Sequence, residues 1–170
     1  MPLPPESTIS NLVPQGESET LEFKTSFNDE SLETIVAFAN AQGGTLLIGV
    51  SDEGEISGIQ LGKKTLEDWA NRIKDSTDPR LQPSMVQNAF EQKMVVLIRI
   101  EPLVNGPAST RGRFFKRVGR TNQRMSHDEI KLNLLRGSGL SWDAVVEPQA
   151  TLEDLDLAKV DSSQAWARGR

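Results

Sequence analysis

Residues 37–54, AFANAQGGTLLIGVSDEG, place a helix end, a strand and a turn in direct succession. Gly43 and Gly44 follow the last helical residues, and glycine ends a helix in the left-handed conformation with little steric cost. The apolar run 45–50 has the length of a strand that is buried on both faces, although its periodicity alone would also fit a short buried helix. Because glycines flank the run, we favour the strand. Asp52 then lies in a turn at the end of a central strand.

The residues on either side of this stretch predict an α+β domain with a mixed, largely antiparallel sheet and about three helices. Apolar and alternating segments predict strands at 20–24, 45–50, 55–59, 83–90, 93–100 and 113–118. Apolar residues at helical spacing, each set preceded by capping residues, predict helices that begin near 29, 65 and 126. The segment 55–59 is expected to pair with 45–50 as a hairpin.

The two ends of the chain differ from this central region. Residues 1–16 hold four of the nine prolines and little else that could pack, so we expect a Pro-rich arm that lies on a surface or on a partner. Residues 17–147 form the expected domain. Residues 148–170 are acidic and then basic, which predicts a C-terminal tail: either a docked short helix or a linker to a further region.

Composition limits the class of protein. The 170 residues include no cysteine, which excludes disulfides and thiolate metal sites. No apolar run reaches the roughly 20 residues that cross a bilayer, and the start lacks the pattern of a signal peptide, so we expect a cytoplasmic protein without a membrane partner. The formal net charge is -5, yet residues 111–136 carry a local charge of +6, and the remainder therefore carries -11. This distribution keeps a nucleic-acid partner open.

Several catalytic motifs are missing. Residues 58–65 are one residue short of a Walker phosphate loop, so we expect no ATP as cofactor. Neither a dinucleotide-binding glycine motif nor a nucleophile elbow is present. His127 is the single histidine, and it lies at the start of a predicted helix, which argues against a His-based triad or a zinc site.

Three carboxylates are candidates for a metal site. Glu17 and Glu22 precede or lie in the first strand, and Asp52 follows the central one. If these strands are neighbours, the three could act as catalytic residues that hold Mg²⁺ or Mn²⁺, a hard cation that activates water against a phosphodiester. Glu17 must then precede the strand, since an odd spacing sends two residues of one strand to opposite faces. The alternative is that these residues are solvated or cap turns.

The basic segment gives the candidate nucleic-acid contacts. On the strand 113–118, alternation places Arg113, Phe115 and Arg117 on one face and Phe114, Lys116 and Val118 on the other. The polar segment after Gly119 is expected to supply backbone N–H groups beside basic side chains, as phosphate sites commonly do. The predicted contacts are Lys24, Arg113, Lys116, Arg117, Arg120 and Arg124. A solvated basic face without a partner is the alternative.

Four blocks of the sequence together resemble one family. They are Glu17-Ser18-x-x-x-Glu22-Phe23-Lys24, the stretch from Ala37 to Gly54, the single residue Gly58, and Phe115-x-Arg117-Val118-Gly119-x-Thr121-Asn122. In this order they resemble the Schlafen AlbA-type domain, also described as a DNA-binding domain and formerly as a divergent AAA ATPase.

The resemblance implies an α+β domain that in bacteria and archaea often forms the N-terminal part of transcriptional regulators, before a helix-turn-helix region. It thereby implies DNA or RNA as partner and a C-terminal effector domain outside this chain. In animal Schlafen proteins a Glu-Glu-Asp trio cleaves transfer and ribosomal RNA with a metal ion, and the matching positions here are Glu17, Glu22 and Asp52. Those nucleases use two lobes of one chain, so a groove here would need a homodimer. A dimerisation or sensing domain remains a third hypothesis.

Overall fold

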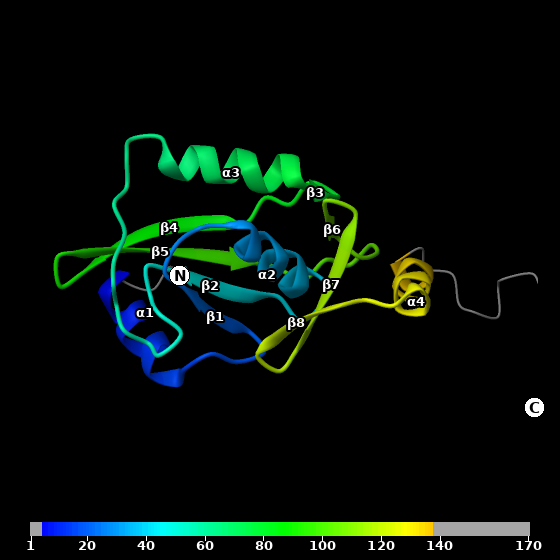
Figure 1. Cartoon of the computed structure of the whole chain (residues 1–170), viewed down its shortest axis with the longest axis horizontal. Helices are drawn as coiled ribbons and strands as arrows, with labels where there is room; N and C mark the ends of the chain where they lie inside the picture. The colour runs from blue at the N-terminus through cyan, green and yellow to red at the C-terminus, as the bar shows by residue number, and fades with distance from the viewer. Residues whose placement is uncertain (1–4, 138–170) are drawn as a thin grey trace, which may run out of the picture. The chain divides into compact units, whose positions relative to one another are not determined.

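Residues 5–137 are described by the computed structural model of the protein, and they alternate between helices and strands (Figure 1). The helices are α1 (Pro5–Leu12), the 3-10 helix η1 (Val13–Gln15), α2 (Asp29–Ala39), α3 (Thr65–Ser76) and α4 (His127–Gly137). The strands are β1 (Leu21–Lys24), β2 (Gly44–Ile48), β3 (Thr77–Asp78), β4 (Ser84–Phe90), β5 (Lys93–Ile100), β6 (Ser109–Thr110), β7 (Arg113–Val118) and β8 (Thr121–Arg124). The predicted tail and the last part of the predicted domain lie outside these residues.

Two sheets organise the described residues. The first has the strand order β1-β2-β5-β4, in which β1 and β2 are parallel and the other neighbours are antiparallel. The second has the order β3-β6-β7-β8 and is antiparallel throughout. The predicted α+β class with a mixed, largely antiparallel sheet is therefore confirmed. No helix among residues 5–137 combines the length and apolar character that a membrane span requires.

Strand β2 is buried on both faces, as its apolar run predicts. Leu46 and Ile48 belong to a cluster with the apolar residues of α2, together with Ile73 of α3. Leu47 points to the opposite face, where it joins a second cluster with Ile9 of α1. The first sheet is thus covered on one face by α2 and α3 and on the other by α1.

The Gly43-Gly44 pair allows the chain to turn tightly between the end of α2 and the start of β2. Gly43 has a φ of +79°, and a Cβ there would lie 2.6 Å from the carbonyl oxygen of Ile100. A Cβ at Gly44 would lie 2.7 Å from the ring of Phe38. Only glycine fits both positions without a shift of neighbouring atoms.

The N-terminal segment differs from the expected arm. Instead of packing little, residues 5–12 form α1, and Ile9 is fully buried beside Phe23. The helix begins at Pro5, because proline is tolerated in the first turn, where its missing N–H has no partner to lose. Leu12 and Val13 also pack against this cluster, so the segment docks through several apolar side chains.

The predicted hairpin with 55–59 is wrong, since this segment forms only an isolated bridge between Val50 and Ile56. The chain then crosses the end of β2: Gly58 N–H donates to the oxygen of Gly49 and Ile59 N–H to that of Met94. A Cβ at Gly49 would lie 3.1 Å from the Met94 oxygen, so its glycine permits this crossing. The other five predicted strands and the three predicted helices are confirmed.

Candidate functional site

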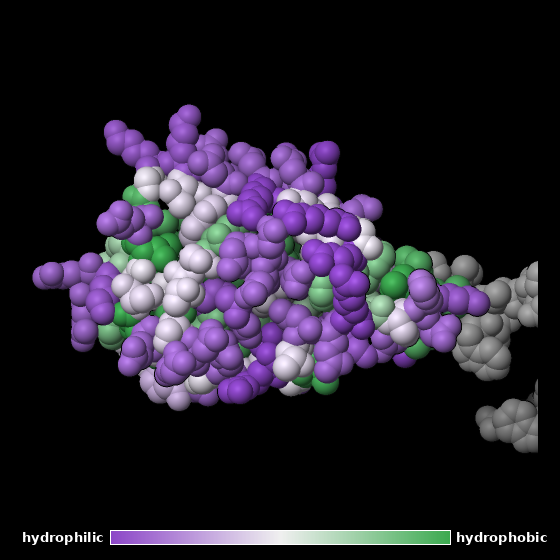
Figure 2. Space-filling view, viewed as in Figure 1, coloured by the Kyte–Doolittle hydropathy of each residue, from purple (hydrophilic) through white to green (hydrophobic). Residues whose placement is uncertain are grey.

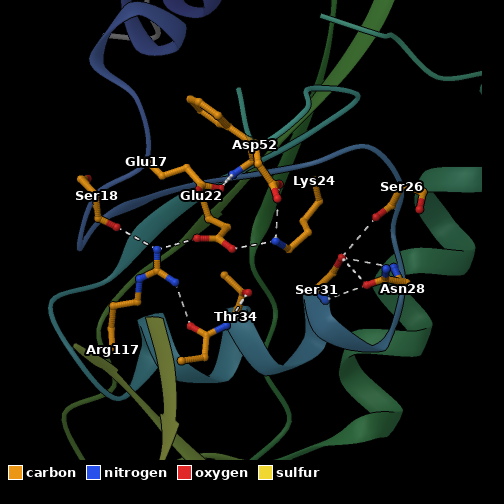
Figure 3. A network of polar contacts seen from close by, with 12 residues as sticks. Glu17, Ser18, Glu22, Lys24, Ser26, Asn28, Ser31, Thr34, Asp52 and Arg117 are labelled. Carbon is orange, nitrogen blue, oxygen red and sulfur yellow. Dashed lines mark hydrogen bonds and ion pairs between the residues drawn. The ribbon is translucent and has the colours of Figure 1, made fainter. Parts of the chain in front are cut away.

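The three predicted carboxylates gather at one end of β1 and β2. Parallel pairing sets Lys24 opposite Ile48, so the turn that contains Asp52 lies beside Lys24. Glu17 precedes β1, as its spacing required, and its Oε1 accepts a hydrogen bond from Phe23 N–H at 3.2 Å. Figure 3 shows Glu17, Glu22 and Asp52 around Lys24. The condition set for such a site, that these two strands are neighbours, is met.

Lys24 forms ion pairs with two carboxylates of this cluster. Its Nζ lies 2.8 Å from Oε1 of Glu22 and 4.0 Å from Oδ1 of Asp52. The side chain of Lys24 is 17% exposed, whereas that of Asp52 is 72% exposed. Asp52 is therefore far more open to solvent than Lys24.

Arg117 occupies the other side of Glu22. Its Nη2 lies 2.5 Å from Oε2 of Glu22 and donates to the carbonyl oxygen of Ser18 at 2.8 Å, while its Nη1 donates to Oδ1 of Asn122 at 2.9 Å. The guanidinium also lies over the ring of Phe38, 5.0 Å from its centroid. The side chain of Arg117 is 0% exposed. It therefore faces the interior, where we had expected a phosphate contact.

These contacts decide how well the carboxylates suit a divalent cation. Both oxygens of Glu22 are held by cationic side chains, and one oxygen of Glu17 accepts a backbone N–H. Among residues 5–137, no group of three or more His, Cys, Asp or Glu side chains is arranged to hold a metal ion. In this arrangement the trio does not fit a three-carboxylate metal site, and binding of Mg²⁺ or Mn²⁺ stays a prediction.

The pKa values of the cluster follow from burial and charge. Burial is the largest influence on Glu17 and raises its pKa; the Phe23 N–H and Lys24 oppose this, while Glu22 and Asp52 add to it, and the net pKa is raised. For Lys24, burial alone lowers the pKa. The hydrogen bond and charge of Glu22, with the charges of Asp52 and Glu17, outweigh burial and raise the pKa above its usual value. Lys24 is thus held as an ammonium.

The hairpin of β7 and β8 carries the other predicted contacts. Arg113 pairs with Glu33 of α2 at 3.2 Å and lies over the ring of Phe115, and Lys116 pairs with Glu129 of α4. Phe115 is the buried phenylalanine of this strand, and Phe114 is only half-buried.

Arg120 and Arg124 are exposed, and neither forms an ion pair within the described part of the chain. Arg120 lies in the turn that joins the two strands, and Arg124 ends β8. The view in Figure 2 shows mostly hydrophilic residues over α2 and β7. Of the six predicted contacts, these two arginines are the ones free to meet a phosphate.

Sequence reasoning missed two asparagines that hold the hairpin. Asn122 lies opposite Arg117 in the β7–β8 ladder, and its Nδ2 donates to Oγ1 of Thr34 in α2 at 2.8 Å. Asn40, at the end of α2, donates to the oxygens of Ala108 and Phe115, each at 2.8 Å, and accepts from Ala108 N–H at 2.6 Å. Both belong to the blocks that resemble the family, and that was the available signal. We had read residues 119–122 as a turn, whereas β8 begins at Thr121.

The comparisons with known proteins agree with this fold. No curated protein matches the chain significantly. The structure of the DIP2311 protein from Corynebacterium diphtheriae is similar, with a TM-score of 0.60 and 20% identity over 94% of this chain and 33% of that chain. This chain therefore spans about a third of that protein.

A second similar structure is the N-terminal domain of a protein from Nitrosomonas europaea that is described as related to the ATP-dependent DNA helicase RecG. Its TM-score is 0.52 and its identity 19%, over 74% of this chain and 97% of that chain. At such low identity, both structures show a shared fold. The model of the family described as Schlafen, AlbA_2 matches residues 17–126, which is well over half of the sequence. The chain therefore belongs to the Schlafen AlbA_2 family.

Proposed function

We propose that this chain is a nucleic-acid-binding module that holds the phosphate backbone at the β7–β8 hairpin. The observation that carries the proposal is the pair Arg120 and Arg124, both exposed and both without a counter-ion among residues 5–137. Unpaired guanidinium groups on an exposed hairpin are well suited to phosphate oxygens, which they bind with two parallel hydrogen bonds.

In this proposal, the remaining predicted contacts contribute less to phosphate binding. Arg113 and Lys116 are half-buried and tied to Glu33 and Glu129, so a phosphate would have to compete with these carboxylates. Lys24 is surrounded by carboxylates that screen its charge from a polyanion. We therefore assign the main contribution to the two free arginines.

The family and one neighbour add support. The Nitrosomonas europaea domain belongs to a protein described as helicase-related, and the DIP2311 protein is about three times as long as the aligned part. We propose that the chain serves as a DNA- or RNA-binding module of a larger regulatory protein, in which an effector region follows it. A role in transcription regulation is part of this proposal.

The experiment is a salt titration of binding. Fluorescent duplex DNA and transfer RNA are titrated with the wild type and with the double variant Arg120→Glu/Arg124→Glu, in EDTA, between about 50 and 200 mM salt. We expect the slope of log affinity against log salt to fall by about two in the variant, since each lost phosphate contact removes about one unit. Arg80→Glu is the matched control, because Arg80 is an exposed arginine outside the hairpin. Equal slopes for the double variant and the control would refute the proposal.

A metal-dependent endoribonuclease is the second candidate. The observation in its favour is that Glu17, Glu22 and Asp52 converge on one cluster, as the family's nucleases would require. Such an activity needs Glu22 free of Lys24 and Arg117. The test incubates transfer RNA with protein in Mn²⁺ or EDTA and compares Asp52→Asn with the wild type on denaturing gels. Fragments that need Mn²⁺ and vanish in the variant support a nuclease; intact RNA in all lanes removes this candidate.

If cleavage is observed, we propose that two copies form the RNA groove. The described residues supply one lobe, and a dimer would supply the second. Light scattering on the complex with transfer RNA measures the number of protein copies, and a single copy on cleaved RNA would exclude the dimeric groove.

A further inference from the structure

We propose that Glu22 is the buried counter-ion of Arg117 and that this pair positions the β7–β8 hairpin, with Arg120 in its turn. What the hairpin holds rests on the proposed nucleic-acid function. Figure 3 shows the chain of contacts that carries the proposal, from Lys24 through Glu22 and Arg117 to Thr34.

The burial of Arg117 is the first step. A guanidinium stays charged at any pH the protein meets, and its side chain here is 0% exposed. Its Nε–H has no hydrogen-bond partner, so its charge depends on the three acceptors around Nη1 and Nη2. Glu22 is the only carboxylate among these acceptors. Neutralising it would leave a buried charge without compensation, which is strongly unfavourable.

The second step is the connection between separate elements. Glu22 lies on β1 of the first sheet, whereas Arg117 lies on β7 of the second. Asn122 accepts from Arg117 and donates to Thr34, which adds β8 and α2 to the same network. Since Arg117 and Asn122 are cross-strand neighbours, the network fixes the end of the hairpin nearest its turn. Arg120 is in that turn, so its direction depends on the buried pair.

The third step concerns the role of Glu22 itself. Its Oε1 lies 2.8 Å from Lys24 and its Oε2 lies 2.5 Å from Arg117. Its side chain is 7% exposed, whereas that of Asp52 is 72% exposed. Glu22 therefore pairs with two cationic side chains of its own chain, one at each carboxylate oxygen. In this protein it is a positioning residue, in contrast to the metal ligand that the family resemblance implies.

The test is Glu22→Gln, which keeps the shape of the side chain and removes its charge. Hydrogen exchange, read residue by residue, compares amides of β7 and β8 with those of β5. We expect exchange in the hairpin to accelerate by about tenfold or more while β5 changes little. Asp52→Asn is the matched control, because it removes a carboxylate from the same cluster without touching Arg117. Equal hairpin exchange in the two variants would overturn the proposal.

Asn122→Ala tests the same idea if Glu22→Gln fails to fold. It leaves the ion pair intact and cuts the link from Arg117 to Thr34, so the hairpin amides should again exchange faster. Exchange at the wild-type rate would count against the network as the element that holds the hairpin.

A binding measurement separates this inference from the proposed function. If the wild type binds nucleic acid, Glu22→Gln should weaken binding although it makes the protein less acidic, a sign opposite to simple electrostatics. If the wild type binds no nucleic acid but hairpin exchange still accelerates in Glu22→Gln, the positioning role is supported and the proposed nucleic-acid function is refuted. Mn²⁺ alone is the last probe: a rise in melting temperature that Glu22→Gln abolishes would identify a metal ligand and overturn the inference.

Discussion

Replacing Asn40 by Ala should detach the end of α2 from the second sheet. The Asn40 side chain makes three hydrogen bonds to backbone groups, two to Ala108 and one to Phe115. These groups lie 68 and 75 residues away along the sequence, so the side chain joins distant segments. Alanine supplies neither donor nor acceptor, and the three backbone groups would lose their partner.

The magnitude follows from the number of bonds. A hydrogen bond in a folded protein contributes about 1 kcal/mol net, so the three together are worth about 3 kcal/mol of unfolding free energy. For a chain of this length, that loss corresponds to a fall of about 6–12 °C in melting temperature. Hairpin strand β7 carries Phe115, so the region that supports Arg120 should loosen with it.

Urea unfolding followed by circular dichroism measures the change. The control is Asn133→Ala, which removes one hydrogen bond, to the carbonyl oxygen of Glu129 within α4. We expect this control to lose about 1 kcal/mol or less. If Asn40→Ala loses no more than the control, the side chain of Asn40 does not hold the end of α2 to the second sheet and the reasoning is refuted.

Three further predictions concern backbone conformation and ionisation. Gly43→Ala should lower the free energy of unfolding by several kcal/mol, because its Cβ would meet the Ile100 oxygen at 2.6 Å. Gly119 has a φ of +56° and open space around it, so Gly119→Ala should lower the same free energy, measured by urea unfolding, by about 1–2 kcal/mol. Asp29 accepts hydrogen bonds from Arg111 and Arg72, which lower its pKa below the usual 3.8. Its stabilisation is therefore present above pH 3.8 and lost as the pH falls through the lowered pKa, so wild type and Asp29→Asn should differ in urea midpoint at pH 7 and the difference should shrink as the pH falls below 3.8. Lys24→Met should raise the pKa of Glu17 further, since the Lys24 charge lowers it; a carbon-13 titration of the Glu17 carboxyl group that shows no rise would contradict the described cluster.

Local sequence patterns predicted most of the elements. Asn28 caps α2 through a reciprocal hydrogen-bond pair with Ser31, a motif visible in the sequence. The strands at β4, β5 and β7 follow from their apolar and alternating residues. These features depend on neighbours close in the chain, so they can be read without the fold. By contrast, β8 consists of polar residues, and its pairing with β7 gives no apolar signal.

The residues of the candidate site could be predicted from the sequence, but the side chains that pair with them could not. The sequence by itself determined that Glu22 in β1 and Asp52, soon after β2, could lie close together if these strands were neighbours, whereas the approach of Glu17, which precedes β1, depends on how the chain folds back onto the strand. Only the tertiary structure decided that Arg117 is buried against Glu22, since these residues are 95 positions apart and alternation does not say which face of β7 meets the core. A basic residue in a strand looks the same in sequence whether it contacts solvent or a buried carboxylate. The difference lies in desolvation and in a partner from the other sheet, which arise only when the chain packs.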